Sequence, residues 1–202
     1  MFIQVIQGTV QDADALRAAL DAWVTDLAPG AAGWVGSTGG VTDDGRFVAT
    51  ARFESEAAAR ANSDRPEQGE WWSRVEGAVT DVAFHDCTDV TLVNGGGSDR
   101  AGFVQVMQTS AREPAQVARL KEIGEQMTPH MAEMRPDLMG LTIAMHDDGG
   151  TTQLAYFTSE VAARAGESTP PPPELEAQMQ EMGALMGEVD YFDLRDPWLY
   201  SA

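Results

Sequence analysis

Hydrophobic positions at the start of the chain first follow the period of a strand and then that of a helix. The run FIQVIQ at residues 2–7 is rich in β-branched side chains and predicts a strand. Asp12 or Asp14 can cap the helix that follows, and Pro29 with Gly30 ends it. Between these signals, apolar residues recur at helical spacing: Leu16, Leu20, Trp23, Val24 and Leu27.

Turn and breaker residues divide the next segment into two strands, a broken helix and a last strand. The turn signal Asp43-Asp44-Gly45 predicts a hairpin between strands at about 33–42 and 46–53. A second helical region begins at Ser55, is interrupted by Pro66 and resumes towards Val75. A strand at about 80–92 completes the order β-α-β-β-α-β.

The second half of the chain repeats this pattern. FVQVMQ at 103–108 matches 2–7, DDGGTTQLAYF at 147–157 matches 43–53, TSEVAARA at 158–165 matches 54–61, and VDYFDLRD at 189–196 matches 82–89. We interpret this as a tandem duplication, with repeats at 1–93 and 103–202 joined by a Gly-rich linker at 94–102. The proline run at 170–173 resembles an SH3-type ligand, but it matches the Pro66 break and is better explained as a loop.

Two β-α-β-β-α-β units predict an α+β protein built from two ferredoxin-like repeats. Each would have a four-stranded sheet with both helices on one face, so the other face needs a cover. We expect the two sheets to cover each other as a fused dimeric α+β barrel within one chain. We also expect residues 89–93 and 197–200 to extend past their own sheets onto the other half.

The strand–helix junction resembles that of a known family. Residues 53–60, FESEAAAR, are similar to the aromatic-Glu-Ser-Glu-x-Ala junction of the antibiotic biosynthesis monooxygenase (ABM) family, and residues 157–164 repeat it. The resemblance covers nearly the whole chain and implies dimeric α+β barrels. Family members include cofactor-free monooxygenases, haem-degrading enzymes and proteins without known chemistry.

The functional residues of that family carry over only in part. Where quinone-forming members have Asn, Trp and Tyr, the first half has Ala49, Phe53 and Ala59, and in the second half the Asn position holds Gln153. In haem-degrading members, an Asn on the first strand, a Trp and a helical His form the site. Gln7 and Gln108 stand near that Asn, and Trp71 or Trp72 near that Trp. The helical region 55–79 contains no His, so we expect no axial haem ligation and no cofactor.

Candidate ligand-binding residues follow from strand and helix geometry. Gln4 and Gln7 point to opposite faces of their strand, and the resemblance implies that Gln7, like Gln108, faces the barrel interior. Each Gln either lines a pocket or is satisfied by sheet neighbours. Trp71 and Trp72 are adjacent on a helix, so we expect one to pack and the other to sit at a barrel mouth. The predicted ligand-binding residues are Gln7, Phe53, Trp71, Trp72, Gln108 and Gln153.

Other polar residues give no catalytic or metal-binding pattern. His85, His130 and His146 lack the spacing of a metal motif, so no metal site is expected. Asp86 and Asp89 recur as Asp193 and Asp196, which favours a shared structural role as hydrogen-bond acceptors at strand ends over catalysis. The methionines of the second half serve as core or as an adaptable ligand surface.

Composition narrows the classes of partner. The 202-residue chain is 43 % hydrophobic and carries a formal net charge of -19, which opposes binding to nucleic acid and to anionic membranes. The N-terminus has no signal-peptide pattern and there is one cysteine, so we expect a cytoplasmic protein. We also expect a self-contained pseudo-dimer, monomeric or weakly homodimeric.

Two functions remain open at this point. The first is binding of a small apolar or aromatic molecule, extending to cofactor-independent monooxygenation of an aromatic or polyketide-like substrate. There an amide such as Gln7, Gln108 or Gln153 would hold an oxyanion. The second is a non-catalytic binding or interaction protein with filled barrels.

Overall fold

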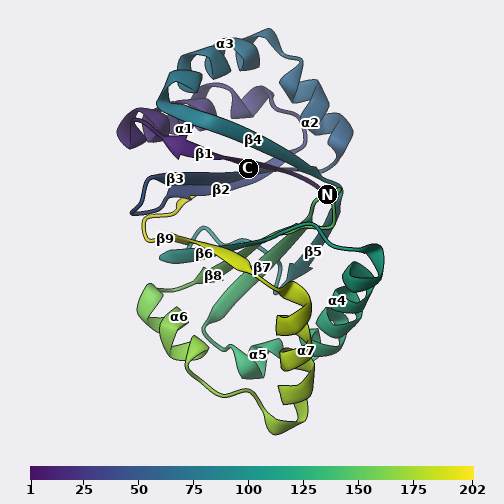
Figure 1. Ribbon diagram of the computed structural model, residues 1–202. Coiled ribbons are helices and arrows are strands. Elements are labelled where there is room, and N and C mark those ends of the chain that lie inside the picture. Colours follow the sequence, from purple (N-terminus) through teal and green to yellow (C-terminus); the bar gives the residue numbers. More distant parts are fainter. The chain divides into compact units, whose positions relative to one another are not determined.

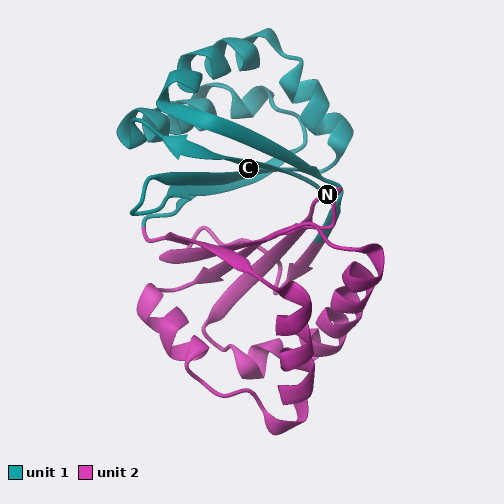
Figure 2. Ribbon diagram, viewed as in Figure 1, with its two compact units in different colours: residues 1–90, 196–202 teal, residues 91–195 magenta.

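The chain folds into two compact units, seen in a computed structural model that describes residues 1–202. The first unit comprises residues 1–90 and 196–202, and the second comprises residues 91–195 (Figure 2). Each unit contains a five-stranded sheet with helices packed on one face (Figure 1). The ferredoxin-like α+β architecture predicted for each half is confirmed.

The first unit has the predicted β-α-β-β-α-β order with its second helical region divided in two. Its sheet has the strand order β10-β2-β3-β1-β4, so β1 is an interior strand between β3 and β4. Its elements are β1 (Phe2–Val10), α1 (Ala13–Asp26), β2 (Trp34–Val41), β3 (Arg46–Phe53), α2 (Glu56–Ser63), α3 (Pro66–Val75), β4 (Val79–Cys87) and β10 (Trp198–Ser201).

The second unit repeats this order. Its sheet has the strand order β5-β7-β8-β6-β9, and β6 lies between β8 and β9 as β1 lies between β3 and β4 in the first unit. Its elements are β5 (Asp89–Val93), β6 (Phe103–Thr109), α4 (Pro114–Met127), α5 (Met131–Met134), β7 (Leu138–Met145), β8 (Thr151–Phe157), α6 (Glu160–Glu167), α7 (Glu176–Met186) and β9 (Val189–Leu194).

The prediction of two four-stranded sheets, with one strand at 80–92, is wrong in its details. Pairing of β4 with β1 ends at Ile3↔Cys87, where β1 itself begins, so residues beyond Cys87 have no partner on β1. They form β5 instead, which is hydrogen-bonded to β7 of the other sheet. Likewise β10 adds to β2, with Trp198 opposite Gly39. The expected exchange of residues 89–93 and 197–200 between the halves is thus observed.

Helix starts follow the capping chemistry expected from the sequence. The carboxylate of Asp12 accepts a hydrogen bond from the Ala15 amide at 2.9 Å, which identifies the cap of α1. Ser55 and Ser159 cap α2 and α6 identically, each accepting from the amide three residues on at 3.2 Å. Proline occupies the start of α3, as its fixed φ allows.

Close backbone packing beside β7 requires a glycine. A Cβ built on Gly140 would lie 1.7 Å from the carbonyl oxygen of Gly96, in the loop that follows β5. Gly96 itself has φ +80°, a region that glycine adopts without strain. These two positions therefore fix the path of the loop after β5.

Candidate functional site

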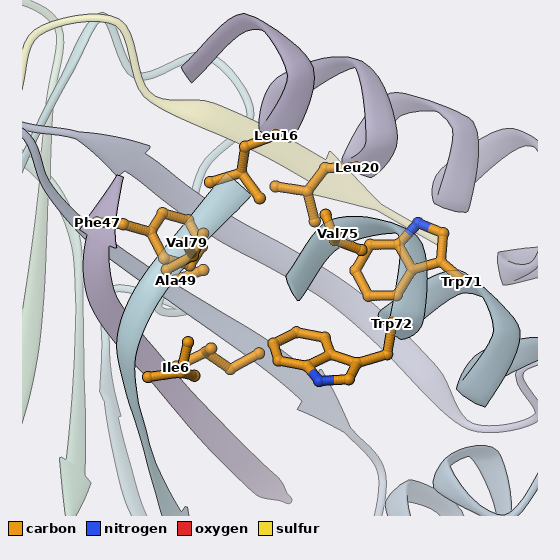
Figure 3. A pocket seen from close by; sticks show the side chains of 10 residues that line it. Ile6, Leu16, Leu20, Phe47, Ala49, Trp71, Trp72, Val75 and Val79 are labelled. Atoms are coloured by element: carbon orange, nitrogen blue, oxygen red, sulfur yellow. The ribbon is translucent and has the colours of Figure 1, made fainter. Parts of the chain in front are cut away.

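An apolar cavity lies inside the first unit, between the sheet and helices α1 and α3 (Figure 3). Its volume is about 30 Å³, which is enough for a single water molecule. The sheet supplies the floor and the two helices supply the walls. The lining side chains are Ile6, Leu16, Leu20, Phe47, Ala49, Trp71, Trp72, Val75, Val79 and Val82.

Regular spacing brings these side chains together. Leu16 and Leu20 are four residues apart on α1 and project from the same side of the helix towards the sheet (Figure 3). On the sheet, Ile6 and Ala49 are directly opposite in the β1–β3 register, and Phe47 lies two residues from Ala49 on the same face. The cavity therefore depends on one face of the sheet and on two helices.

The two adjacent indoles are held differently. The Trp71 N–H donates to the backbone carbonyl of Ala19 on α1 at 2.9 Å, which ties α3 to α1. Trp72 makes ring contacts, with centroids 6.0 Å from Trp71 and 5.5 Å from Phe84. Phe84 is 48 % exposed and Trp72 itself is half-buried, so this contact lies near the surface. That one of the pair packs while the other sits at a barrel mouth or at the surface stays a prediction.

The C-terminal strand completes the core beside the cavity. Trp198 is only 5 % exposed and its ring lies 6.2 Å from that of Phe47. Arg17 of α1 lies over the Trp198 ring at 5.9 Å and also pairs with Asp196. These contacts fix α1 through the residue next to Leu16, so β10 supports the cavity wall.

A hydrogen bond from the end of β10 to α1 adds to this support. The Tyr200 hydroxyl donates to Asp21 Oδ1 at 2.6 Å. Burial of the phenol, and then this bond to the carboxylate, raise the pKa of Tyr200 well above its ordinary value. The neutral phenol therefore persists as a donor throughout the neutral range.

No titratable side chain lines the cavity. The only polar side-chain groups there are the two indole N–H groups, and Trp71 already uses its own. A general acid or base needs a titratable group within hydrogen-bonding reach of the substrate. The lining thus suits binding by shape and apolar contact.

The structure brings only some of the predicted site residues of the first half together. Trp71 and Trp72 both line the cavity. Phe53 lies on the helix face in a neighbouring cluster, against which Trp71 also packs. Gln7 neighbours Ile6 on β1, so it points to the face of the sheet opposite the helices. Gln7 and Trp72 therefore cannot line one cavity, although a ligand-binding role for each stays a prediction.

The predicted glutamines of the second half are also on opposite faces. Gln108 donates to Thr152 Oγ1 at 3.0 Å, and His146 Nε2 lies 2.8 Å from the same oxygen. Gln153 pairs with Met107 on the helix face and donates weakly to Thr151 Oγ1 at 3.4 Å. The side-chain amides of Gln108 and Gln153 thus each donate a hydrogen bond to a threonine of the same sheet.

A polar pair recurs at one position in both units. Gln4 donates to Asp86 at 2.8 Å, and Gln105 donates to Asp193 at 3.2 Å. The expectation that these aspartates act as strand hydrogen-bond acceptors is confirmed. Asp196, in contrast, pairs with Arg17.

Sequence reasoning missed most of the cavity lining. Leu16, Leu20 and Val75 were assigned to the core by their spacing, and the repeated strand gave no reason to single out Ile6 or Ala49. Alignment of the halves carried one usable signal. It places Phe47 and Ala49 opposite Thr151 and Gln153, so these positions are apolar in one half and polar in the other.

Two further features of the chain concern metal ions and membranes. No group of three or more His, Cys, Asp or Glu side chains is arranged to hold a metal ion. None of the helices has the length and apolar character required to cross a bilayer.

Comparison with known proteins gives structural neighbours only. The sequence matches no protein-family model and no curated protein. A putative monooxygenase from Lactobacillus acidophilus superposes with a TM-score of 0.77 at 11 % identity, covering 99 % of this chain and 95 % of that one. A putative monooxygenase from Fusobacterium nucleatum superposes with a TM-score of 0.78 at 8 % identity, covering 99 % of this chain and 94 % of that one.

A third structural neighbour is an anthrone oxidase-like protein. It gives a TM-score of 0.63 at 14 % identity, covering 98 % of this chain and 93 % of that one. A ferredoxin-fold protein from Listeria monocytogenes, related to antibiotic biosynthesis monooxygenases, superposes with a TM-score of 0.51 at 10 % identity. This match covers 100 % of this chain and 96 % of that one. The fold of this chain is therefore similar to that of solved structures described as putative monooxygenases and as related to antibiotic biosynthesis monooxygenases.

Proposed function

We propose that the first unit binds a small, uncharged, aromatic molecule in the cavity between its sheet and helices α1 and α3. The observation that carries this proposal is the lining, which is wholly apolar and includes two indole rings. Indole faces and edges pack well against other aromatic rings. Apolar concave sites with few polar groups are typical of small-molecule binding.

The lining also sets the charge of the ligand. A charged group placed among Ile6, Leu16, Leu20 and Val75 would lose its hydration without gaining a partner. The absence of an acid or base from the lining favours binding over proton-transfer chemistry at this site. A non-catalytic binding protein is therefore the function best supported by this cavity.

A cavity-filling substitution tests the proposal. Titration with a panel of phenols and quinones should quench tryptophan fluorescence, and all five tryptophans lie in the first unit. Ala49→Leu should abolish saturable quenching because the longer side chain fills the cavity. Ala51→Leu, two residues along the same strand face but outside the lining, should leave quenching intact. Equal quenching in both variants would refute the proposal.

A second candidate is cofactor-independent monooxygenation of an aromatic or polyketide-like substrate. It is supported by the names of the neighbours that match over nearly the whole chain. One oxygen atom of O₂ would enter the product, the other would leave as water, and the substrate would supply the electrons. Gln153, which lies on the helix face of the second unit, is the amide best placed to hold an oxyanion beside a helix-side substrate.

Oxygen uptake distinguishes the two functions. A catalyst should consume O₂ in proportion to an added phenolic or anthrone-type substrate. Loss of one oxyanion donor typically slows a reaction roughly 10²-fold. Because water can partly replace the amide, we expect Gln153→Leu to slow O₂ uptake at least about tenfold. Binding without O₂ uptake would leave the first proposal standing alone.

We also infer that residues 1–93 and 103–202 are two copies of one ancestral repeat, joined by 94–102. Support comes from the shared element order, the shared serine caps and the recurring Gln–Asp pair. Exchange of β5 and β10 between the sheets ties the two copies into one folded chain.

A further inference from the structure

We propose that Trp72 occupies the ligand position in the unliganded protein and is displaced by an uncharged fused bicyclic aromatic molecule of about the size of indole. This inference rests on the proposed binding function and names its ligand class. It follows from the size of the cavity, from the different anchoring of the two indoles and from the position of Phe84.

The cavity is too small for any aromatic ligand as it stands. Its volume is about 30 Å³, whereas a cavity that accepts benzene measures roughly 150 Å³. One lining side chain must therefore leave before a ring can enter. Removal of an indole from the lining would supply space for a ring system of its own size.

Most of the lining is held in the core. Leu16, Phe47, Val75 and Val79 are buried members of one hydrophobic cluster. Trp71 packs against two clusters and is anchored to α1 by its hydrogen bond to Ala19. Displacing any of these would break core packing, which typically costs several kcal/mol when a large side chain is lost.

Trp72 lacks such anchors. It belongs to neither cluster, and its ring contacts those of Trp71 and Phe84. Figure 3 shows its ring reaching across the cavity towards Ile6. A rotation about χ1 carries the ring out along the half-exposed Phe84, and rotamer changes of this kind are rapid at surface positions.

The space that Trp72 leaves sets the size, shape and charge of the ligand. It is flat, bounded by the fixed Trp71 ring, Ile6 and Val82, and free of charged groups. A fused bicyclic aromatic regains the stacking that Trp72 gives up, so the exchange conserves apolar contact. A single benzene ring would leave part of the space empty, and an ionised molecule would be penalised by desolvation.

Fluorine NMR of 5-fluorotryptophan-labelled protein tests the displacement directly, with 2-naphthol as the probe. Trp71→Phe and Trp72→Phe assign the two resonances. We expect 2-naphthol to shift the Trp72 resonance saturably and to increase its H₂O/D₂O solvent isotope shift, while the Trp71 resonance stays shielded from solvent. Saturable binding with no change in the solvent exposure of Trp72 would overturn the displacement and leave the binding function intact. No saturable change at any tryptophan would overturn both.

Two matched variants separate displacement from simple cavity creation. Trp72→Ala should tighten 2-naphthol binding by at least about threefold, because the ligand no longer competes with a side chain. Trp71→Ala removes the same group one residue away and should weaken binding, because Trp71 is a fixed wall. Tighter binding in both variants, or weaker binding in both, would contradict the proposal. The NMR titration on the unsubstituted protein stands even if one variant fails to fold.

Discussion

The two units place different chemistry at equivalent positions between sheet and helices. In the first unit, Phe47 and Ala49 leave an apolar cavity beside Trp71 and Trp72. In the second, their counterparts Thr151 and Gln153 face the helices, and Thr151 lies 2.8 Å from Thr109 Oγ1. The same arrangement of elements therefore holds a small apolar cavity in the first unit and a hydrogen-bonded polar cluster in the second.

An arginine closes the polar cluster of the second unit. Arg112 Nη1 donates to Thr109 Oγ1 at 2.5 Å, and its Nε donates to the carbonyl of Leu185 at the end of α7 at 3.0 Å. Burial lowers the pKa of Arg112 without removing its charge at neutral pH. The two units thus share one element order, whereas a few positions between sheet and helices are apolar in the first unit and polar in the second.

The largest expected effect comes from removing the second copy altogether. Residues 1–93 alone lack β10, so the edge of β2 and the place of Trp198 are left uncovered. We expect this fragment to form a homodimer or an insoluble product. Size-exclusion chromatography with light scattering measures its state, and a well-folded monomer would show that the first unit needs no strand from the rest of the chain.

Loss of Trp198 alone should destabilise the first unit strongly. Trp198→Ala removes a buried ring from the cluster that contains Phe47 and Leu16 and should cost about 3–5 kcal/mol. Leu199→Ala, on the neighbouring and more exposed position, is the matched control and should cost much less. Urea unfolding followed by tryptophan fluorescence reports on the first unit in both. Similar costs for the two variants would argue against β10 as part of this core.

Equivalent arginines should differ between the units. Arg164 pairs with Glu160, Glu167 and Asp193 and lies over the Phe103 ring at 5.5 Å. Arg60, its counterpart, pairs with Glu56 in a more exposed position. After allowance for solvent screening, Arg164→Ala should cost about 1–2 kcal/mol. Arg60→Ala should cost much less, because the Arg60 side chain is more exposed and has one carboxylate partner. Equal costs by urea unfolding would mean that the extra partners contribute nothing.

The smallest effect concerns the bond between Tyr200 and Asp21. The folded protein holds the phenolic proton more tightly than the unfolded chain does, because burial and the carboxylate raise its pKa. Stability of the first unit should therefore be steady below the ordinary tyrosine pKa of about 10 and fall as the pH rises above it. Tyr200→Phe should flatten this decline, and Tyr191→Phe should not. An unchanged decline in Tyr200→Phe would exclude Tyr200 as its source.

The repeated strands and caps made the frame of each unit predictable from sequence. FIQVIQ and FVQVMQ predicted the first strand of each unit, and Ser55 marked a helix start, because these signals are local. The split after Cys87 was harder to place, since it depends on where β1 begins in space. Local signals therefore gave the elements, and pairing between distant segments decided their limits.

The site was less predictable because it depends on tertiary packing. Trp71 and Trp72 were found as adjacent indoles, yet their partners Leu20 and Ala49 come from other elements. Gln7 was predicted to line the same site as the indoles. Gln7 follows Ile6 on β1, however, and neighbouring residues of a strand point to opposite faces of the sheet. Which face meets the helices is decided by the whole fold, and a single strand does not reveal it.

The central claim is that the apolar cavity between the sheet and helices of the first unit is the site that binds an aromatic molecule. Calorimetric titration of 2-naphthol into Ala49→Leu and Gln153→Leu tests it most directly, since the two positions are equivalent in the two units. The claim predicts that Ala49→Leu loses saturable binding, while Gln153→Leu binds as tightly as the unsubstituted protein. Binding retained in Ala49→Leu and lost in Gln153→Leu would contradict it.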